Sequence, residues 1–151
     1  MTTTANLPIA RGVLEEIVGA TATKPGYLTV SIPGTSYRLH LRSVGTPATA
    51  VGKRISGVIR CEARRVDRID SGGRFVEPVY GRPRRICGTV LSADAGANAL
   101  VVDAGGASTP GYAMGLPVVV RLTDARQKAT DFAYPQMVVF DVLDGATIEP
   151  A

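Results

Sequence analysis

The chain has 151 residues, of which 45% are apolar, 20% charged and 5% aromatic, and its formal net charge is +4. This length suits one domain or two very small ones, and the apolar content excludes a disordered polyelectrolyte. The two cysteines are too few for a disulfide framework, no apolar run reaches the roughly 20 residues of a membrane helix, and the first residues lack a secretory signal, so we expect a cytoplasmic protein without a membrane partner.

The first apolar segment, residues 7–18, fits two structures. Its apolar residues follow a helical stripe, for which Asn6 could serve as the N-cap. Gly12 and Gly19 disfavour a long helix. An internal repeat, described below, favours a strand from Val13 to Val18, with a helix as the alternative.

Residues 27–42 predict a β-hairpin. Leu28 and Val30 alternate with polar residues before a turn at Pro33-Gly34, and Leu39 and Leu41 alternate with polar residues after it. A period of two on both arms is typical of strands that have one buried face and one wet face.

Further strands are predicted along the rest of the chain. Residues 54–66 alternate over a long strand whose polar face carries three arginines. Pro78 interrupts the short extended segment 75–80, which suits a sheet edge or a loop. Four later segments also have the pattern of strands: 86–92, 99–104, 116–122 and 137–143. The last two are apolar on nearly both faces, so we expect the other half of the molecule or a second subunit to cover them.

The strand pattern of the first half recurs in the second half. The segments 12–14, 27–30 and 37–41 have counterparts, and one more long strand follows each set. The counterparts are 88–91, 100–103 and 118–122. This correspondence predicts a duplicated meander of four or five strands.

Five short strands in each half, opening with a curled hairpin, resemble the oligonucleotide/oligosaccharide-binding (OB) barrel. The run from Val51 to Asp67 is also similar to segments of uncharacterised small bacterial proteins, and that resemblance implies no function. We expect an all-β fold of short antiparallel strands in two small OB-like barrels, with a first half at 1–70, a basic connector at 71–85 and a second half at 86–151. One pseudo-symmetric barrel or a two-sheet sandwich is the alternative.

Positive charge is concentrated in the middle of the chain. Residues 53–87 hold ten Lys/Arg against four Asp/Glu, whereas residues 88–151 hold three against seven. On neighbouring strands the arginines would form a cationic face for a phosphate backbone, and Tyr27 could stack on a base. The alternatives are a solvated face, or docking of the basic face on the acidic second half. The candidate ligand-binding residues are Arg38, Arg42, Arg54, Arg60, Arg64, Arg82, Arg84 and Arg85.

The sequence offers little for catalysis. The single histidine, His40, has no acidic residue close to it in the sequence, and phosphate-loop, calcium-loop and zinc-ligand motifs are absent. We therefore interpret His40 as an exposed strand residue, and Cys61 and Cys87 as buried small apolar residues. No catalytic residue, metal site or cofactor is expected.

These features predict a non-enzymatic binding or assembly module that uses protein–protein contacts. A basic half paired with an acidic half, together with two-sided apolar strands, suits a homo-oligomer. The alternative is an OB-like nucleic-acid-binding protein that uses the arginine-rich sheet face. The predominance of arginine favours planar, fixed pairing at a protein interface, and the low aromatic content disfavours single-strand binding.

Overall fold

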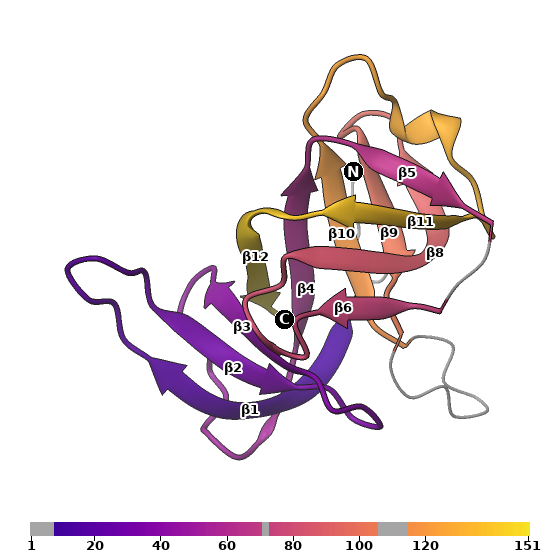
Figure 1. Cartoon of the computed structure of the whole chain (residues 1–151). Coiled ribbons are helices and arrows are strands. Elements are labelled where there is room, and N and C mark those ends of the chain that lie inside the picture. The colour runs from indigo at the N-terminus through magenta and orange to yellow at the C-terminus, as the bar shows by residue number, and fades with distance from the viewer. Residues whose placement is uncertain (1–7, 71–72, 106–114) are drawn as a thin grey trace.

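The computed structural model describes residues 8–70, 73–105 and 115–151, and their regular structure is almost entirely β (Figure 1). The all-β prediction is therefore confirmed. None of the described helical residues forms a helix long and apolar enough to span a membrane. The elements are β1 (Ala10–Val18), β2 (Tyr27–Ser31), β3 (Arg38–Ser43), β4 (Arg54–Ala63), β5 (Val66–Ile69), β6 (Phe75–Glu77), β7 (Tyr80–Gly81), β8 (Arg85–Asp94), β9 (Ala99–Asp103), β10 (Pro117–Leu122), the 3₁₀-helix η2 (Ala129–Asp131), β11 (Met137–Asp141) and β12 (Leu143–Pro150).

Five strands close a barrel in the order β1–β2–β3–β12–β4, with β4 pairing back to β1. The ambiguous segment at the start of the chain is thus a strand, as the repeat predicted. β12 comes from the C-terminal end of the chain but lies between β3 and β4, parallel to β3 and antiparallel to β4. Figure 1 shows β1, β2 and β3 curling round towards β12 and β4.

β4 also belongs to a second set of strands. One edge of β4 pairs with β1 over residues 54–57 and with β10 over residues 59–63. From β10 the sheet continues through β9, β8 and β11 to β5, and β6 lies beside β8. Only Arg64 and Arg65 separate β5 from β4 along the chain. The second set of strands therefore begins at β4 and ends at β5, which directly follows β4 along the chain.

The pairing pattern of β1–β4 is repeated in β8–β11. β1, β2 and β3 form an antiparallel meander with β4 beside β1, and β8, β9 and β10 form another with β11 beside β8. The first strand of each meander contains a register shift. In each first strand a glycine lies so close to the second strand that a Cβ would collide with a backbone oxygen, Gly12 with that of Ser31 and Gly88 with that of Asp103.

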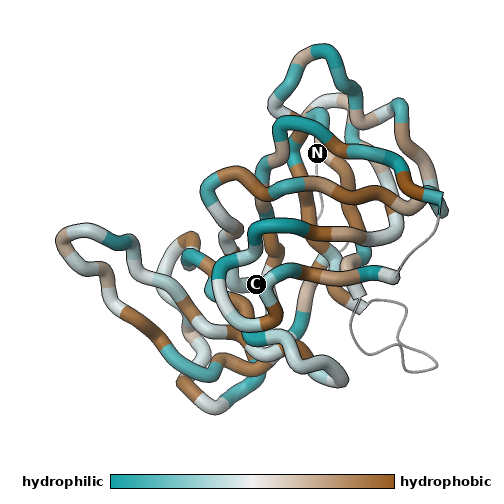
Figure 2. Tube along the Cα trace, viewed as in Figure 1, coloured by the Kyte–Doolittle hydropathy of each residue, from teal (hydrophilic) through white to brown (hydrophobic). Residues whose placement is uncertain are grey.

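One hydrophobic core extends through both sets of strands. Leu41 of the barrel and Val102 of the second set belong to the same cluster of buried residues. Figure 2 shows hydrophobic positions along the strands of both sets, interleaved with hydrophilic ones. Of the two strands expected to be covered on both faces, β11 is buried on both at its centre, at Val138 and Val139. β10 buries Val118 and Val120 on one face, but on the other Val119 is half-buried and Arg121 exposed.

Strand neighbours and directions differ in part from the antiparallel expectation. Three pairings are parallel, namely β10 with β4, β12 with β3, and β7 with β3. Alternation in a sequence indicates which face of a strand is buried, but it carries no information on the direction of its neighbour. The division at 1–70, 71–85 and 86–151 stays a prediction, and β12 of the second half closes the barrel of the first.

Candidate functional site: an aromatic and arginine-bearing sheet face

Three aromatic rings gather on the outward face of β2, β3 and β7. Tyr27 in β2 stacks on His40 in β3, with ring centroids 4.3 Å apart and planes inclined by 19°. Tyr80 in β7 meets the same imidazole edge-to-face, at 5.4 Å and 81°. Stacked and T-shaped pairs of this kind contribute about 0.5–1.5 kcal/mol beyond the area they bury. The rings therefore form one connected cluster drawn from three strands.

The alternation of β3 decides which of its side chains join this cluster. Leu39 and Leu41 are buried in the core, so Arg38, His40 and Arg42 point to the opposite face. His40 lies opposite Thr29 of β2 in the antiparallel register, and Tyr27 lies two residues away on the same face of β2.

β7 brings its own aromatic residue to the same face of β3. Arg38 lies opposite Tyr80 in the parallel pairing of β3 with β7. In the sequence β7 lies between β6 and β8, well after β3. We call Tyr27, His40, Tyr80, Arg38 and Arg42 the aromatic–arginine face.

Two further contacts fix the basic side of this face. Arg42 donates a hydrogen bond from Nη2 to the backbone oxygen of Asp144. Arg82 packs its side-chain carbons on Gly145, in space that a Cβ would need. Arg42 and Arg82 therefore contact adjacent residues, Asp144 and Gly145, near the start of β12. Arg38 is exposed and forms no ion pair with any residue that the structure describes.

The imidazole of His40 is half-buried rather than exposed, which corrects the interpretation from the sequence. Its Nε2 atom is buried and has no hydrogen-bond partner among the described residues. A neutral imidazole has one donor and one acceptor nitrogen, and leaving such a group buried and unpaired costs about 1–3 kcal/mol. The face thus contains a polar atom whose binding capacity is unused.

Of the other predicted arginines, Arg60 lies on the same side of the sheet as Arg42, and Arg60 and Arg85 pair with acidic residues. Arg60 pairs with Glu149 at 2.8 Å, and Arg85 pairs with Asp141 at 2.8 Å. Both acids lie in the second half of the chain, so part of the basic middle segment docks on the acidic part within one molecule. Arg60 shares a row with Arg42 across Thr147, because β12 separates β3 from β4.

The remaining candidates are scattered over the surface. Arg54 begins β4 opposite Val13, Arg64 follows the other end of β4, and both are exposed. Arg84 is exposed, and its backbone bonds to Glu77 and to Val142. The structure therefore brings Arg38, Arg42 and Arg82 near the aromatic rings and leaves the other candidate arginines elsewhere.

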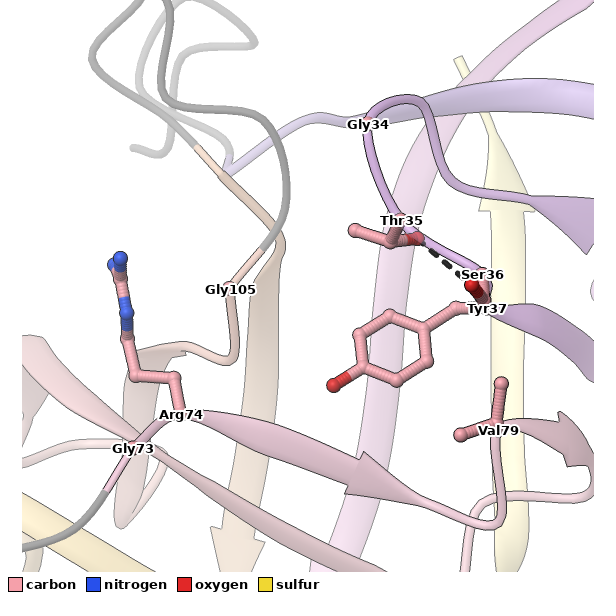
Figure 3. Close-up of a pocket in the computed structure, with 8 residues that line it drawn as sticks. All are labelled: Gly34, Thr35, Ser36, Tyr37, Gly73, Arg74, Val79 and Gly105. Atoms are coloured by element: carbon pink, nitrogen blue, oxygen red, sulfur yellow. Dashed lines mark hydrogen bonds between the residues drawn. The ribbon is translucent and has the colours of Figure 1, made fainter.

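A second candidate is an open depression of about 580 Å³ beside the turn between β2 and β3 (Figure 3). Its two large polar side chains already have partners. Arg74 pairs with the buried Asp103 at 2.6 Å, and the hydroxyl of Tyr37 accepts a hydrogen bond from the backbone N–H of Val76. The depression therefore offers a ligand few free polar groups. It is lined by Gly34, Thr35, Ser36, Tyr37, Gly73, Arg74, Val79 and Gly105.

The two thiols have the character of core residues. Burial raises the pKa of Cys61 to about 12, and burial also raises the pKa of Cys87, against the opposing charge of Arg85. Because the thiolate is the nucleophilic form, both thiols are unreactive near neutral pH. Within the described parts of the chain, no three His, Cys, Asp or Glu side chains gather as a metal site would require.

Sequence reasoning identified Tyr27 as a stacking residue but missed His40 and Tyr80. The signal for His40 was its place on the outward face of a predicted strand beside Tyr27. Tyr80 gave no such signal, because its contact depends on the pairing of β7 with β3, which are distant in the sequence.

Comparison of the chain with protein-family models gave no match. Comparisons with curated proteins and with solved structures gave no significant match either.

Proposed function

We propose that this protein binds single-stranded nucleic acid on the aromatic–arginine face. The observation that carries the proposal is the cluster of Tyr27, His40 and Tyr80 with Arg38 and Arg42 on either side of the imidazole in β3. Aromatic rings stack on bases while cationic side chains follow the phosphates, and this combination is typical of single-strand sites.

The strand order of the barrel supports an OB-like identity. An OB barrel has the order 1–2–3–5–4–1 with strands 3 and 5 parallel, and here β12 takes the fifth place, parallel to β3. OB folds bind oligonucleotides on the face of strands 2 and 3. The aromatic–arginine face occupies that position.

The repeated pairing pattern supports a duplicated OB-like unit and supplies an internal comparison. When Gly12 is aligned with Gly88, β9 corresponds to β2 and β10 corresponds to β3. The facing pair Val101 and Val119 then takes the place of the facing pair Thr29 and His40. By the same register, Ala99 takes the place of Tyr27. The second set of strands thus has small or aliphatic residues where the first has rings. Because β9 and β10 form the same kind of strand pair without aromatic side chains, the pairing of β2 with β3 does not need its rings, and we attribute the rings to binding.

The spacing of the arginines suits a short stretch of backbone. Arg38 and Arg42 are separated by four residues of strand, or about 13 Å between their Cα atoms. Arg82 adds a third cation near Arg42. Three neutralised phosphates would make log K fall with log salt concentration with a slope of about −2 for a single strand.

The test is fluorescence anisotropy with a labelled oligo-dT of about 12 nucleotides, long enough for one barrel-sized site. We expect Tyr80→Ala to weaken binding about 5- to 150-fold, the range for loss of one stacked base. The matched control is Tyr134→Ala, because Tyr134 is 67% exposed and Tyr80 is 56% exposed. Tyr134 lies three residues before β11, and Figure 1 shows the start of β11 on the opposite side of the molecule from β2 and β3.

A second pair of variants tests whether binding depends on the positive charge of the face. Arg38→Gln should lower the salt slope by about 0.7, whereas Arg65→Gln, an exposed arginine beyond the end of β4, should leave it unchanged. Absence of oligo-dT binding at low salt would refute the proposal, as would equal losses from Tyr80→Ala and Tyr134→Ala.

The assembly module stays a prediction. It was based in part on two apolar strands that needed a cover, and the chain itself buries both faces of β11 at its centre but only one face of β10. The intramolecular pairs of Arg60 with Glu149 and of Arg85 with Asp141 also use charges that would otherwise be available to a second copy.

A further inference from the structure

We infer that Tyr80 is a movable cover over His40 and that Nε2 of His40, once uncovered, selects which base the face accepts. The inference rests on the proposed function and adds base selectivity to it. It starts from the one buried side-chain polar atom without a hydrogen-bond partner among the described residues, which is His40 Nε2. Native proteins leave few buried polar atoms unpaired, and each such atom requires a physical or functional explanation.

The position of the atom points to a ligand. His40 lies in the middle of the aromatic–arginine face, with Arg38 and Arg42 two residues away on either side. Its ring contacts Tyr27 and Tyr80. An imidazole nitrogen between two rings, on a strand that also carries two arginines, matches the needs of a nucleotide, which has a flat base with polar edges and an anionic backbone. The nearby carboxylate of Glu16 is engaged by the hydroxyl of Thr29.

Of the two covering rings, Tyr80 is the one that can move. Tyr27 stands on β2, which is paired on both sides, by β1 and by β3. Tyr80 stands on a strand of two residues that pairs only with β3 among the described strands, and its side chain is 56% exposed. Gly81 follows it with a positive φ of 137°. A rotation of an exposed side chain takes picoseconds to nanoseconds, so the cover can open without moving β7.

Once rotated away from His40, the Tyr80 ring is itself free to stack on a base, and the uncovered Nε2 can form one base-edge hydrogen bond beside the Tyr27 ring. A single imidazole nitrogen is either a donor or an acceptor at a given moment, so it favours bases that present the complementary group. Stacking on Tyr27 and charge from the arginines carry no such preference, because every base has a π-face and every nucleotide a phosphate. His40 is therefore the selective element of an otherwise tolerant face.

The test compares oligo-dT, oligo-dC and oligo-dA of equal length on the wild type and on His40→Phe, which keeps a ring and removes the nitrogen. We expect wild-type affinities to differ by about 5-fold, the size of one hydrogen bond. In His40→Phe they should agree within about 2-fold, near the weakest wild-type value. Tyr134→Ala is the control and should keep the wild-type ranking.

A spectroscopic measurement on the wild type tests the inference without any substitution. His40 is the only histidine, so ¹⁵N-histidine labelling gives the signals of one imidazole. The preferred oligonucleotide should shift the Nε2 signal, and the least preferred one should shift it less. If the oligonucleotides bind but Nε2 is unmoved and His40→Phe keeps the ranking, the inference is wrong and the proposed function stands. If none of them binds, both fail.

Discussion

At the scale of single residues, glycines determine how closely the strands of the barrel approach. A Cβ added to Gly57 in β4 would lie 2.6 Å from the backbone oxygen of Glu149 and 2.8 Å from Cγ1 of Ile148. Glu149 and Ile148 belong to β12, so the contact is at the seam where the last strand enters the barrel. The glycine is needed there for space rather than for an unusual φ.

Gly57→Ala should therefore destabilise the protein. The backbone oxygen of Glu149 cannot retreat without lengthening the hydrogen bonds between β4 and β12, and overpacking of this kind costs about 1–3 kcal/mol. The measurement is the free energy of unfolding from urea titration. The control is Gly19→Ala, since a Cβ at Gly19 meets nothing within 4 Å. Equal stabilities of the two variants would contradict the close approach.

At the scale of elements, side chains protect the free edge of β5. Gln127 forms two hydrogen bonds with the backbone of Val66, accepting from its N–H at 2.8 Å and donating to its oxygen at 2.7 Å. The other edge of β5 pairs with β11. The amide thus occupies the place of another strand, and edge strands without such a cover are sites of aggregation.

Gln127→Glu tests this cover with little change of shape. A carboxylate can accept from the Val66 N–H but cannot donate to its oxygen, so one hydrogen bond is lost and two acceptors face each other. We expect a loss of about 1–3 kcal/mol in the free energy of unfolding. Gln136→Glu is the comparison, because the Gln136 side chain only accepts, from the N–H of Ala133. A carboxylate can replace that acceptor, so the variant should retain wild-type stability.

The individual strands were largely predictable, whereas their arrangement was not. The period of two placed β2 and β3 correctly, because their alternation follows from one buried face. β12 escaped prediction because Asp144 and Gly145 have the composition of a turn, and a register shift interrupts its alternation between Leu143 and Thr147. Sequence periodicity contains no record of which strand lies beside which.

The same limit applied to the candidate site. The arginines of β3 and β4 were expected to share a face if their strands were neighbours. β12 lies between those strands, so Arg42 and Arg60 share a row only across Thr147, and Arg60 pairs with Glu149. The arginines that do meet the rings were recognisable from the alternation of β3. Tyr80 arrives through β7, a pairing of two residues that leaves no periodic trace.

At the scale of the whole molecule, the two sets of strands are interlocked rather than placed side by side. The barrel takes its fifth strand, β12, from the C-terminal end of the chain, and the second set uses the second half of β4 beside β10. β4 is thus shared by the two sets, and β12 of the barrel directly follows β11 of the second set along the chain. Their buried residues form a single cluster.

This interlocking predicts one cooperative unfolding transition for the whole chain, although the sequence repeat favours two halves. Native-state hydrogen exchange measures the free energy of the opening that exposes each amide. The most protected amides of the barrel, such as Leu41, and those of the second set, such as Val102 and Val120, should report the same free energy and the same dependence on urea. Losing β12 from the barrel removes a partner of β4, and β4 in turn supports β10. Two distinct free energies, one for each set, would instead show that the halves at 1–70 and 86–151 open independently despite the shared β4.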